Sequence, residues 1–292
     1  MQGADKSGSK GPATELKAGQ GAPAFETFLK AALGATDPDD LAAFSQPDVE
    51  TVLADTHRLL AQAGNPDPLV AVGEPVELGR RVVTPVVVIS SDKPFIVDSV
   101  LAAIRARGGQ VRLVSHPIMG KGKGATSVLT VLVEPMGEAE REALAGEIET
   151  AMAEVTHAVA DWPAMLARLD EAIAGLGAAR ASAEREEALA FLDWLKDNNF
   201  TLLGMRDYAL EGGVLVPLPA TGLGILRDPA YRFLRSGAEF VEMTPQHKAF
   251  LKASEPLMVT KANVRARVHR RSHMDYIGVK LFGADGRVAG EL

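Results

Sequence analysis

Residues 83–109 encode a strand, a tight turn and a helix, and the predicted fold is built around this unit. Residues 86–89 are four consecutive β-branched side chains, a run that is typical of a strand buried on both faces. Polar residues at 90–92 end this strand and are expected to cap the next helix, with Pro94 in its first turn. Apolar residues then recur at helical spacing from 95 to 104, which predicts an amphipathic helix directly after the turn.

Two further strands and a second helix follow. Residues 110–119 begin with alternating apolar and polar side chains, residues 120–124 are GlyLysGlyLysGly and predict a turn, and residues 127–133 predict another strand. The stretch 138–159 has apolar residues at helical spacing and an acidic outer face. The order β, α, β, β, α is the core of a split βαβ sandwich, in which both helices lie on one face of the sheet.

Composition and periodicity divide the chain into five segments. Residues 1–22 are rich in Gly, Ser, Lys, Ala and Pro and predict a disordered tail. The other predicted segments are a leading helical segment (23–68), a sandwich domain (69–162), a helical linker (163–197) and a second domain (198–292). We expect the start of the sandwich domain to add an edge strand to its sheet, and we expect Trp162 and Pro163 to end its last helix. The linker is predicted to contain two helices.

The second domain is predicted to be mixed α+β, with strands before and after a helical region. The expected strands are 200–210, 213–218, 257–261, 265–270, 276–282 and 288–292, with the helical region at 230–250. GluGlyGly at 211–213 and AspGly at 285–286 supply hairpin turns. This order is compatible with a PAS-like shape. The sequence stops inside the last predicted strand, which favours a chain truncated at Leu292.

Composition limits the classes of function. The net charge of −7 argues against a general nucleic-acid binder. The sequence contains no cysteine, which excludes disulfides, thiolate metal sites and a cysteine nucleophile. No window approaches the roughly 18 to 20 apolar residues that span a bilayer, and no signal-peptide core lies near Met1. We therefore expect a cytoplasmic protein that contacts neither nucleic acid nor membrane.

Three blocks of sequence resemble one protein family. AspLysProPheIleValAspSerVal at 92–100, followed by GlnValArgLeuValSerHisPro at 110–117, resembles the first ACT-type domain of the large bacterial NAD-specific glutamate dehydrogenases. The blocks at 191–208 and 259–282 carry the same resemblance in the same order. The resemblance implies a non-catalytic, amino-terminal regulatory and assembly region. The parent enzyme would convert L-glutamate, NAD and water to 2-oxoglutarate, ammonium and NADH.

The resemblance also implies partners. The remainder of the parent polypeptide would carry the catalytic residues and bind NAD, so we expect no catalytic residue, no cofactor and no metal in this chain. The ACT-like domain would form homo-oligomers and receive a small amino acid as effector. Two other classes of function stay open, namely a free-standing amino-acid-sensing ACT protein and a purely structural oligomerisation module.

One glycine-rich stretch invites comparison with a dinucleotide-binding loop. Residues 222–227 are GlyLeuGlyIleLeuArg, which places Arg227 where the third glycine of that fingerprint belongs. No long predicted helix follows to direct its dipole at a pyrophosphate. We therefore predict no NAD site here.

The candidate effector site is the turn formed by Asp92, Lys93, Pro94 and Phe95, together with Asp98. The resemblance implies that this turn lies at a domain interface, as in ACT domains generally. Free donors at a helix N-terminus favour a carboxylate, and Asp92 or Asp98 would meet an α-ammonium group. ACT domains commonly have a glycine after the proline, where this chain has Phe95. Because the ring would fill or close the pocket, we favour structural assembly over effector binding.

A second candidate site is a basic run near the C-terminus. If residues 265–271 form a strand, Arg265, Arg267, His269 and Arg271 share one face. Together with Lys261, they would bind an anionic ligand or dock against an acidic protein surface. The alternative is a solvated sheet face. The acidic overall charge favours docking to the remainder of the parent chain over binding of RNA or DNA.

Overall fold

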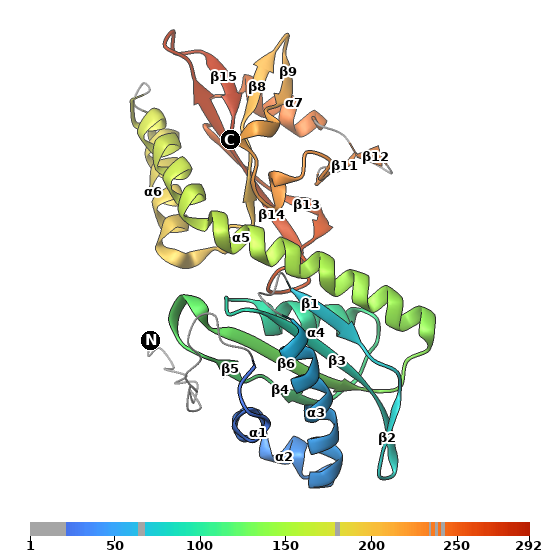
Figure 1. Cartoon of the computed structure of the whole chain (residues 1–292). Coiled ribbons are helices and arrows are strands. Elements are labelled where there is room, and N and C mark those ends of the chain that lie inside the picture. The colour runs from blue at the N-terminus through green and yellow to red at the C-terminus, as the bar shows by residue number, and fades with distance from the viewer. Residues whose placement is uncertain (1–21, 64–67, 179–181, 234, 237–238, 241–242) are drawn as a thin grey trace. The chain divides into compact units, whose positions relative to one another are not determined.

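The computed structural model of the chain describes residues 22–63, 68–178, 182–233, 235–236, 239–240 and 243–292 (Figure 1). The chain forms two compact units, Met1–Ala153 and Glu154–Leu292. Both contain helices and antiparallel sheets, which confirms the predicted mixed α+β class. The tail predicted at 1–22 lies, except for Ala22, outside the described residues, so its disorder stays a prediction. The boundaries of the five predicted segments also stay predictions.

A six-stranded antiparallel sheet forms the centre of the first unit. Its strands follow the order β1-β3-β6-β4, with β2 paired to β3 and β5 paired to β6. The strands are β1 Leu69–Val72, β2 Val76–Leu78, β3 Arg81–Ser91, β4 Val111–Ser115, β5 Ile118–Met119 and β6 Thr126–Val133. The central pair is held in register with Val86 opposite Val131 and Val88 opposite Leu129. These strands are buried on both faces because their apolar runs are nearly continuous.

Two helices cover one face of this sheet, as predicted. They are α4 Ile96–Ala106 and the first part of α5 Glu138–Ala178. Val100 of α4 and Ile148 of α5 are fully buried against the sheet face that contains Val86 and Val88. Successive side chains of a strand point to opposite faces, so the intervening Val87 belongs to the other face of the sheet.

The leading helices cover that other face (Figure 1). They are α1 Phe25–Gly34, α2 Pro38–Leu41 and α3 Gln46–Gln62. Phe28 of α1 and Leu53 of α3 are 0% and 1% exposed and pack in one cluster with Val87. Inside this layer the hydroxyl groups of Thr56 and Thr130 lie 3.1 Å apart. The leading helical segment therefore shares a core with the sandwich.

The edge strand predicted before β3 is present. β1 pairs with β3 in antiparallel register, with Leu69 opposite Ile89 and Val72 opposite Val86. It occupies the edge that a last strand would fill in a βαββαβ sandwich. Within the described residues, no strand after α5 joins this sheet.

Helix α5 continues through Pro163, so the predicted break at Trp162 and Pro163 is wrong. An internal proline removes one backbone hydrogen bond and crowds the preceding turn, at a cost of about 3 kcal/mol. Buried side chains on both sides of it, including Ala158 and Met165, offset this cost through packing. The second helix predicted for the linker is present as α6 Ala183–Trp194. No described helix is both long and apolar enough to cross a membrane.

A five-stranded antiparallel sheet organises the second unit, in the order β13-β14-β15-β8-β9. Its strands are β8 Tyr208–Glu211, β9 Val214–Pro217, β13 Leu257–Arg265, β14 His273–Phe282 and β15 Val288–Glu291. The two predicted hairpin turns are confirmed, because Gly212, Gly213 and Gly286 have φ values of 57°, 82° and 75° that suit glycine. The PAS-like shape stays a prediction.

Short elements complete the second unit and correct two predictions. They are η2 Leu195–Asn199, β7 Gly204–Met205, β10 Leu223–Gly224, η3 Pro219–Thr221, η4 Ile225–Arg227, β11 Arg235–Ser236, β12 Glu239–Phe240 and α7 Pro245–Lys252. The strand predicted at 200–210 is present only as β7 and β8. The helical region predicted at 230–250 contains β11 and β12, which pair with each other, and α7 is the one helix among its described residues. Thr244 caps α7 by accepting the backbone N–H of His247.

Candidate functional site

The predicted effector turn connects β3 to α4, but its geometry differs from the prediction. Helix α4 begins at Ile96 and receives no side-chain cap, so Lys93 and Pro94 precede the helix. The reason is Phe95, whose φ of 72° is left-handed. A right-handed helix cannot include this residue, so α4 does not extend towards Pro94. This conformation costs a residue with a Cβ roughly 1–2 kcal/mol. It explains in physical terms why a glycine suits this position.

The five predicted effector residues do lie around one turn. Asp92, Pro94 and Asp98 are exposed, whereas Lys93 and Phe95 are half-buried. The backbone N–H of Asp92 donates to the carbonyl of Ala125 at 2.8 Å, and the Phe95 carbonyl accepts the N–H of Ser99 at 3.0 Å. Their role in binding an effector stays a prediction.

Replacing Phe95 by glycine is expected to leave the protein more stable than replacing it by alanine, by about 0.5–1 kcal/mol. Both changes remove the same ring, so the two variants differ in the cost of the left-handed backbone. Urea denaturation of the pair measures this difference. An alanine variant at least as stable as the glycine variant would contradict the left-handed φ at this position.

The predicted basic strand face is wrong, because residues 266–272 form a loop between β13 and β14. The loop is closed by the Ala266 N–H, which donates to the Ser272 carbonyl at 2.9 Å, and His269 has a left-handed φ of 66°. The alternation that would align Arg265, Arg267, His269 and Arg271 is therefore lost.

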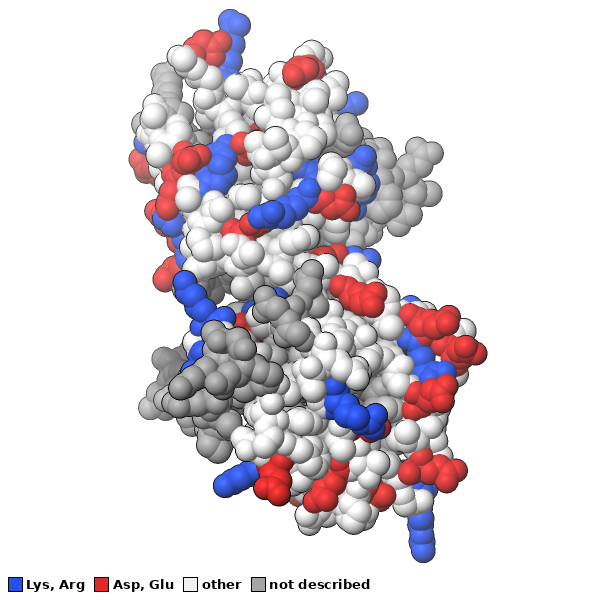
Figure 2. Space-filling view, viewed as in Figure 1, with Lys and Arg blue, Asp and Glu red and all other residues white. Residues whose placement is uncertain are grey.

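Two cations of the basic run have carboxylate partners within the same unit. Arg267 donates to Glu154 at 2.7 Å, and Lys261 lies 2.7 Å from Asp275. Burial raises the pKa of Glu154, and the Arg267 guanidinium opposes that shift. On the face seen in Figure 2, positive and negative side chains are interspersed. Docking or anion binding by this run stays a prediction.

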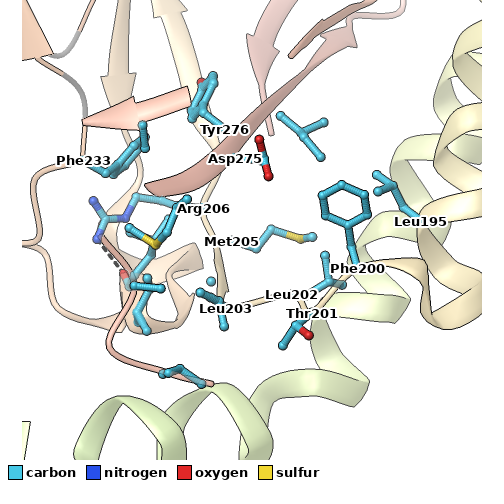
Figure 3. Close-up of a pocket in the computed structure, with 18 of the residues that line it drawn as sticks. Leu195, Phe200, Thr201, Leu202, Leu203, Met205, Arg206, Phe233, Asp275 and Tyr276 are labelled. Carbon is cyan, nitrogen blue, oxygen red and sulfur yellow. Dashed lines mark hydrogen bonds between the residues drawn. The ribbon is translucent and has the colours of Figure 1, made fainter. Parts of the chain in front are cut away.

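The structure reveals a cavity in the second unit that no sequence pattern predicted. It has a volume of about 680 Å³ and lies between β14, the segment 199–206, the end of α6 and the loop 266–272. Phe200, Leu203 and Met205 surround it in Figure 3. Ligand-binding clefts usually have volumes of roughly 300–1,000 Å³ and mostly apolar walls, so the cavity is large enough for a small organic molecule.

Arg206 is the most deeply buried cation on the cavity wall. It is 4% exposed, and its Nη2 donates to the carbonyls of Leu226 at 2.5 Å and Asp228 at 2.7 Å (Figure 3 shows the first). Its Nε has no hydrogen-bond partner. Among the described residues, no carboxylate pairs with this guanidinium. Buried charge without a counter-ion is unfavourable, so this side chain requires an explanation.

Tyr276 connects the cavity to a polar cluster in the core. Its hydroxyl donates to Glu291, which is 0% exposed, and the His247 Nε2 lies 3.6 Å from the same carboxylate. Burial, followed by the nearby negative charge, raises the pKa of Tyr276 well above its usual value. Lys280 donates to the Ala253 carbonyl at 2.7 Å, and burial lowers its pKa. The raised pKa of Tyr276 keeps its hydroxyl protonated, so that it donates to the Glu291 carboxylate.

The glycines of the stretch 222–227 have a structural explanation. A Cβ on Gly224 would lie 2.2 Å from the Leu203 carbonyl oxygen, and Gly224 has a φ of 58°. Its N–H donates to the Asp161 carboxylate at 2.7 Å, and Arg227 binds the same carboxylate. The loop therefore binds a side chain of its own unit. The described residues contain no cluster of three or more groups able to hold a metal ion.

Sequence reasoning missed Arg206 and the cavity. Arg206 lies inside the block at 191–208 that carries the family resemblance, but a single arginine in an otherwise apolar segment gives no motif. Its burial depends on η4 and the loop after it, which supply the two carbonyl acceptors. The burial of Arg206 and its carbonyl partners can therefore be recognised only in the folded chain.

The fold of the first unit and comparisons with known proteins define an ACT-type domain. Residues 28–170 match the model of the family described as the glutamate dehydrogenase ACT1 domain. The chain is 29% identical over 238 residues to the NAD-specific glutamate dehydrogenase of Pseudomonas aeruginosa, covering 71% of this chain. It is 28% identical over 242 residues to that of Halomonas elongata, covering 70% of this chain. The match covers only 14% of the length of each relative. The resemblance stated from the sequence is confirmed.

Proposed function

We propose that this chain is the amino-terminal, non-catalytic regulatory and assembly region of a large NAD-specific glutamate dehydrogenase. The observation that supports this most directly is the match of residues 28–170 to the ACT1 family. In addition, the chain matches only 14% of the length of a much longer NAD-specific glutamate dehydrogenase. The parent reaction would be the oxidative deamination of L-glutamate to 2-oxoglutarate with reduction of NAD. The remainder of the parent chain would supply catalysis and bind NAD in the cytoplasm.

Assembly is the first property that this proposal assigns to the chain. The ACT1 sheet has an edge strand on each side, β1 and β4, and an edge strand offers unpaired backbone groups to a second copy. We expect the purified chain to form a defined oligomer without ligand. Sedimentation velocity over a range of concentrations measures this, and a monomer at every concentration would contradict the assembly role.

Absence of catalysis is the second property. The purified chain, incubated with L-glutamate and NAD, is expected to form no NADH. Absorbance at the NADH band is the measurement, with a full-length bacterial NAD-specific glutamate dehydrogenase as the positive control. Glutamate-dependent NADH formation by this chain would refute the claim that it is non-catalytic.

Regulation is the third property and depends on the turn at Phe95. A ligand at about a hundred times its dissociation constant adds roughly 2.7 kcal/mol to the free energy of unfolding. In a panel of amino acids, we expect a larger rise in the unfolding temperature for Phe95→Gly than for the unmodified chain, because the smaller residue opens the turn. Asp98→Asn added to that variant should remove the rise, whereas Glu77→Gln on β2, an exposed carboxylate elsewhere in the unit, should not. If no amino acid raises the unfolding temperature of Phe95→Gly, assembly is left as the role of this domain.

A further inference from the structure

We propose that the cavity of the second unit binds a small organic anion with an apolar or aromatic body. The proposal is independent of the ACT1 domain, because every residue that lines the cavity lies within Glu154–Leu292. It rests on three observations, namely the charge balance of the wall, the unpartnered donor of Arg206 and the apolar character of the remaining surface.

The charge balance of the cavity wall is positive, although the chain as a whole has a net charge of −7. Among the described residues, the wall contains the cations Arg206, Lys261 and Arg270 and one carboxylate, that of Asp275. That carboxylate already pairs with Lys261 at 2.7 Å. Of the two arginines, Arg270 is exposed to solvent and Arg206 is buried, so an anion is the ligand that would balance the buried guanidinium.

Arg206 locates the polar end of the ligand. A guanidinium has five N–H donors, and here one nitrogen supplies both hydrogen bonds to the Leu226 and Asp228 carbonyls. The buried Nε donor has no partner. Carbonyl groups accept hydrogen bonds but do not neutralise the charge, so the guanidinium keeps its desolvation penalty. A carboxylate or sulfonate near Arg206 would supply a charge-assisted bond and offset that penalty.

The rest of the wall defines the body of the ligand. Phe200 and Phe233 supply aromatic surface from two different segments, and Leu195, Leu203 and Met205 supply aliphatic surface (Figure 3). An inorganic anion would leave these walls in contact with water. An anion with an aromatic or branched aliphatic body would remove that apolar surface from water, which is favourable.

The experiment uses two fluorescent probes that share an aromatic body and differ in charge. The anion is 8-anilinonaphthalene-1-sulfonate, and the neutral probe is N-phenyl-1-naphthylamine. We expect the whole chain to bind one equivalent of each probe in the cavity, with higher affinity for the anion. Arg206→Met should weaken binding of the anion at least tenfold and change binding of the neutral probe less than about twofold, because it removes the cation and keeps an apolar side chain.

Matched variants separate the cavity from other surfaces. Arg287→Met removes an exposed arginine from the turn between β14 and β15 and should leave both affinities unchanged. Thr201→Trp, at an exposed position on the cavity wall, should reduce the binding of both probes by partly filling the space. Near-UV circular dichroism checks that each variant is folded.

If Arg206→Met does not fold, the proposal is tested by the affinities of the two probes for the unmodified chain and for Thr201→Trp. Equal affinity for the anion and the neutral probe would overturn the charge assignment. Binding of both probes that persists undiminished in Thr201→Trp, or the absence of binding to the unmodified chain, would overturn the cavity as a ligand site.

Discussion

Replacing Phe28 by alanine is expected to destabilise the first unit by about 3–5 kcal/mol, the usual range for loss of a fully buried phenylalanine. The side chain is 0% exposed and packs in the layer between the leading helices and the sheet. It also lies against the His57 ring, with the two ring centroids 5.5 Å apart. The effect is expected to be large because α1 packs against the sheet. If α1 did not pack on the domain, Phe28 would be exposed and its replacement would cost little.

Hydrogen exchange read by mass spectrometry measures this effect within the first unit. Peptides from β3 and β6 should lose protection by about a hundredfold or more in Phe28→Ala, because their amides exchange through opening of this core. Phe25→Ala is the matched control, since Phe25 lies on the same helix, contacts the same His57 ring and is only half-buried. It should lose considerably less protection. Equal effects of the two variants would contradict the shared core.

The parts of the fold that the sequence predicted well are those that depend on local pattern. The strand at 86–89, the helix after it and the hairpin glycines at 212–213 and 286 each follow from side-chain periodicity or from a backbone angle that favours glycine. These features are set within a few residues of chain. Longer-range packing does not change them.

The predictions that failed are those in which tertiary contacts outweigh local signals. Pro163 is normally a helix breaker, yet α5 continues through it because buried residues on both sides stabilise the helix. Residues 265–270 alternate like a strand, but the left-handed backbone of His269 and the closing bond from Ala266 to Ser272 end the strand at Arg265 and make 266–272 a loop. Sequence alternation does not reveal either constraint.

The same distinction between local pattern and tertiary contacts applies to the two candidate sites. The turn around Phe95 was located from a local pattern and a resemblance, and only its backbone conformation had to be learned from the structure. The cavity around Arg206 was not predicted, because its walls come from segments spread between α5 and β15. Sequence alone gives no measure of an empty volume between such segments.

Replacing Asp161 by alanine is expected to destabilise the second unit by about 2–3 kcal/mol, since hydrogen bonds to a charged group are worth more than neutral ones. Asp161 is 5% exposed, receives the Gly224 N–H at 2.7 Å and binds the Arg227 guanidinium. These bonds attach β10 and η4 to helix α5. Asp170→Ala on the same helix is the matched control, because that carboxylate is 56% exposed and its removal should have little effect.

The effect of Asp161 should also depend on pH, with a sign fixed by the direction of its pKa shift. The hydrogen bond from Arg227, with a smaller contribution from the Gly224 N–H, holds the pKa of Asp161 below its usual value of 3.8. A carboxyl group with a lowered folded-state pKa stabilises the fold above its unfolded pKa, and this contribution is lost as the pH falls through the folded pKa. We therefore expect the gap in unfolding free energy between the unmodified chain and Asp161→Asn to be constant near neutral pH and to shrink below about pH 4.

Urea denaturation followed by the fluorescence of Trp162 and Trp194 measures this gap, because both tryptophans of the chain lie in the second unit. The asparagine variant keeps the size and one acceptor oxygen of the side chain but not its charge. The gap therefore isolates the charged part of the interaction. A gap that widens on acidification would show that Asp161 is protonated more readily in the folded chain, which would contradict its hydrogen bonding to Arg227 and Gly224.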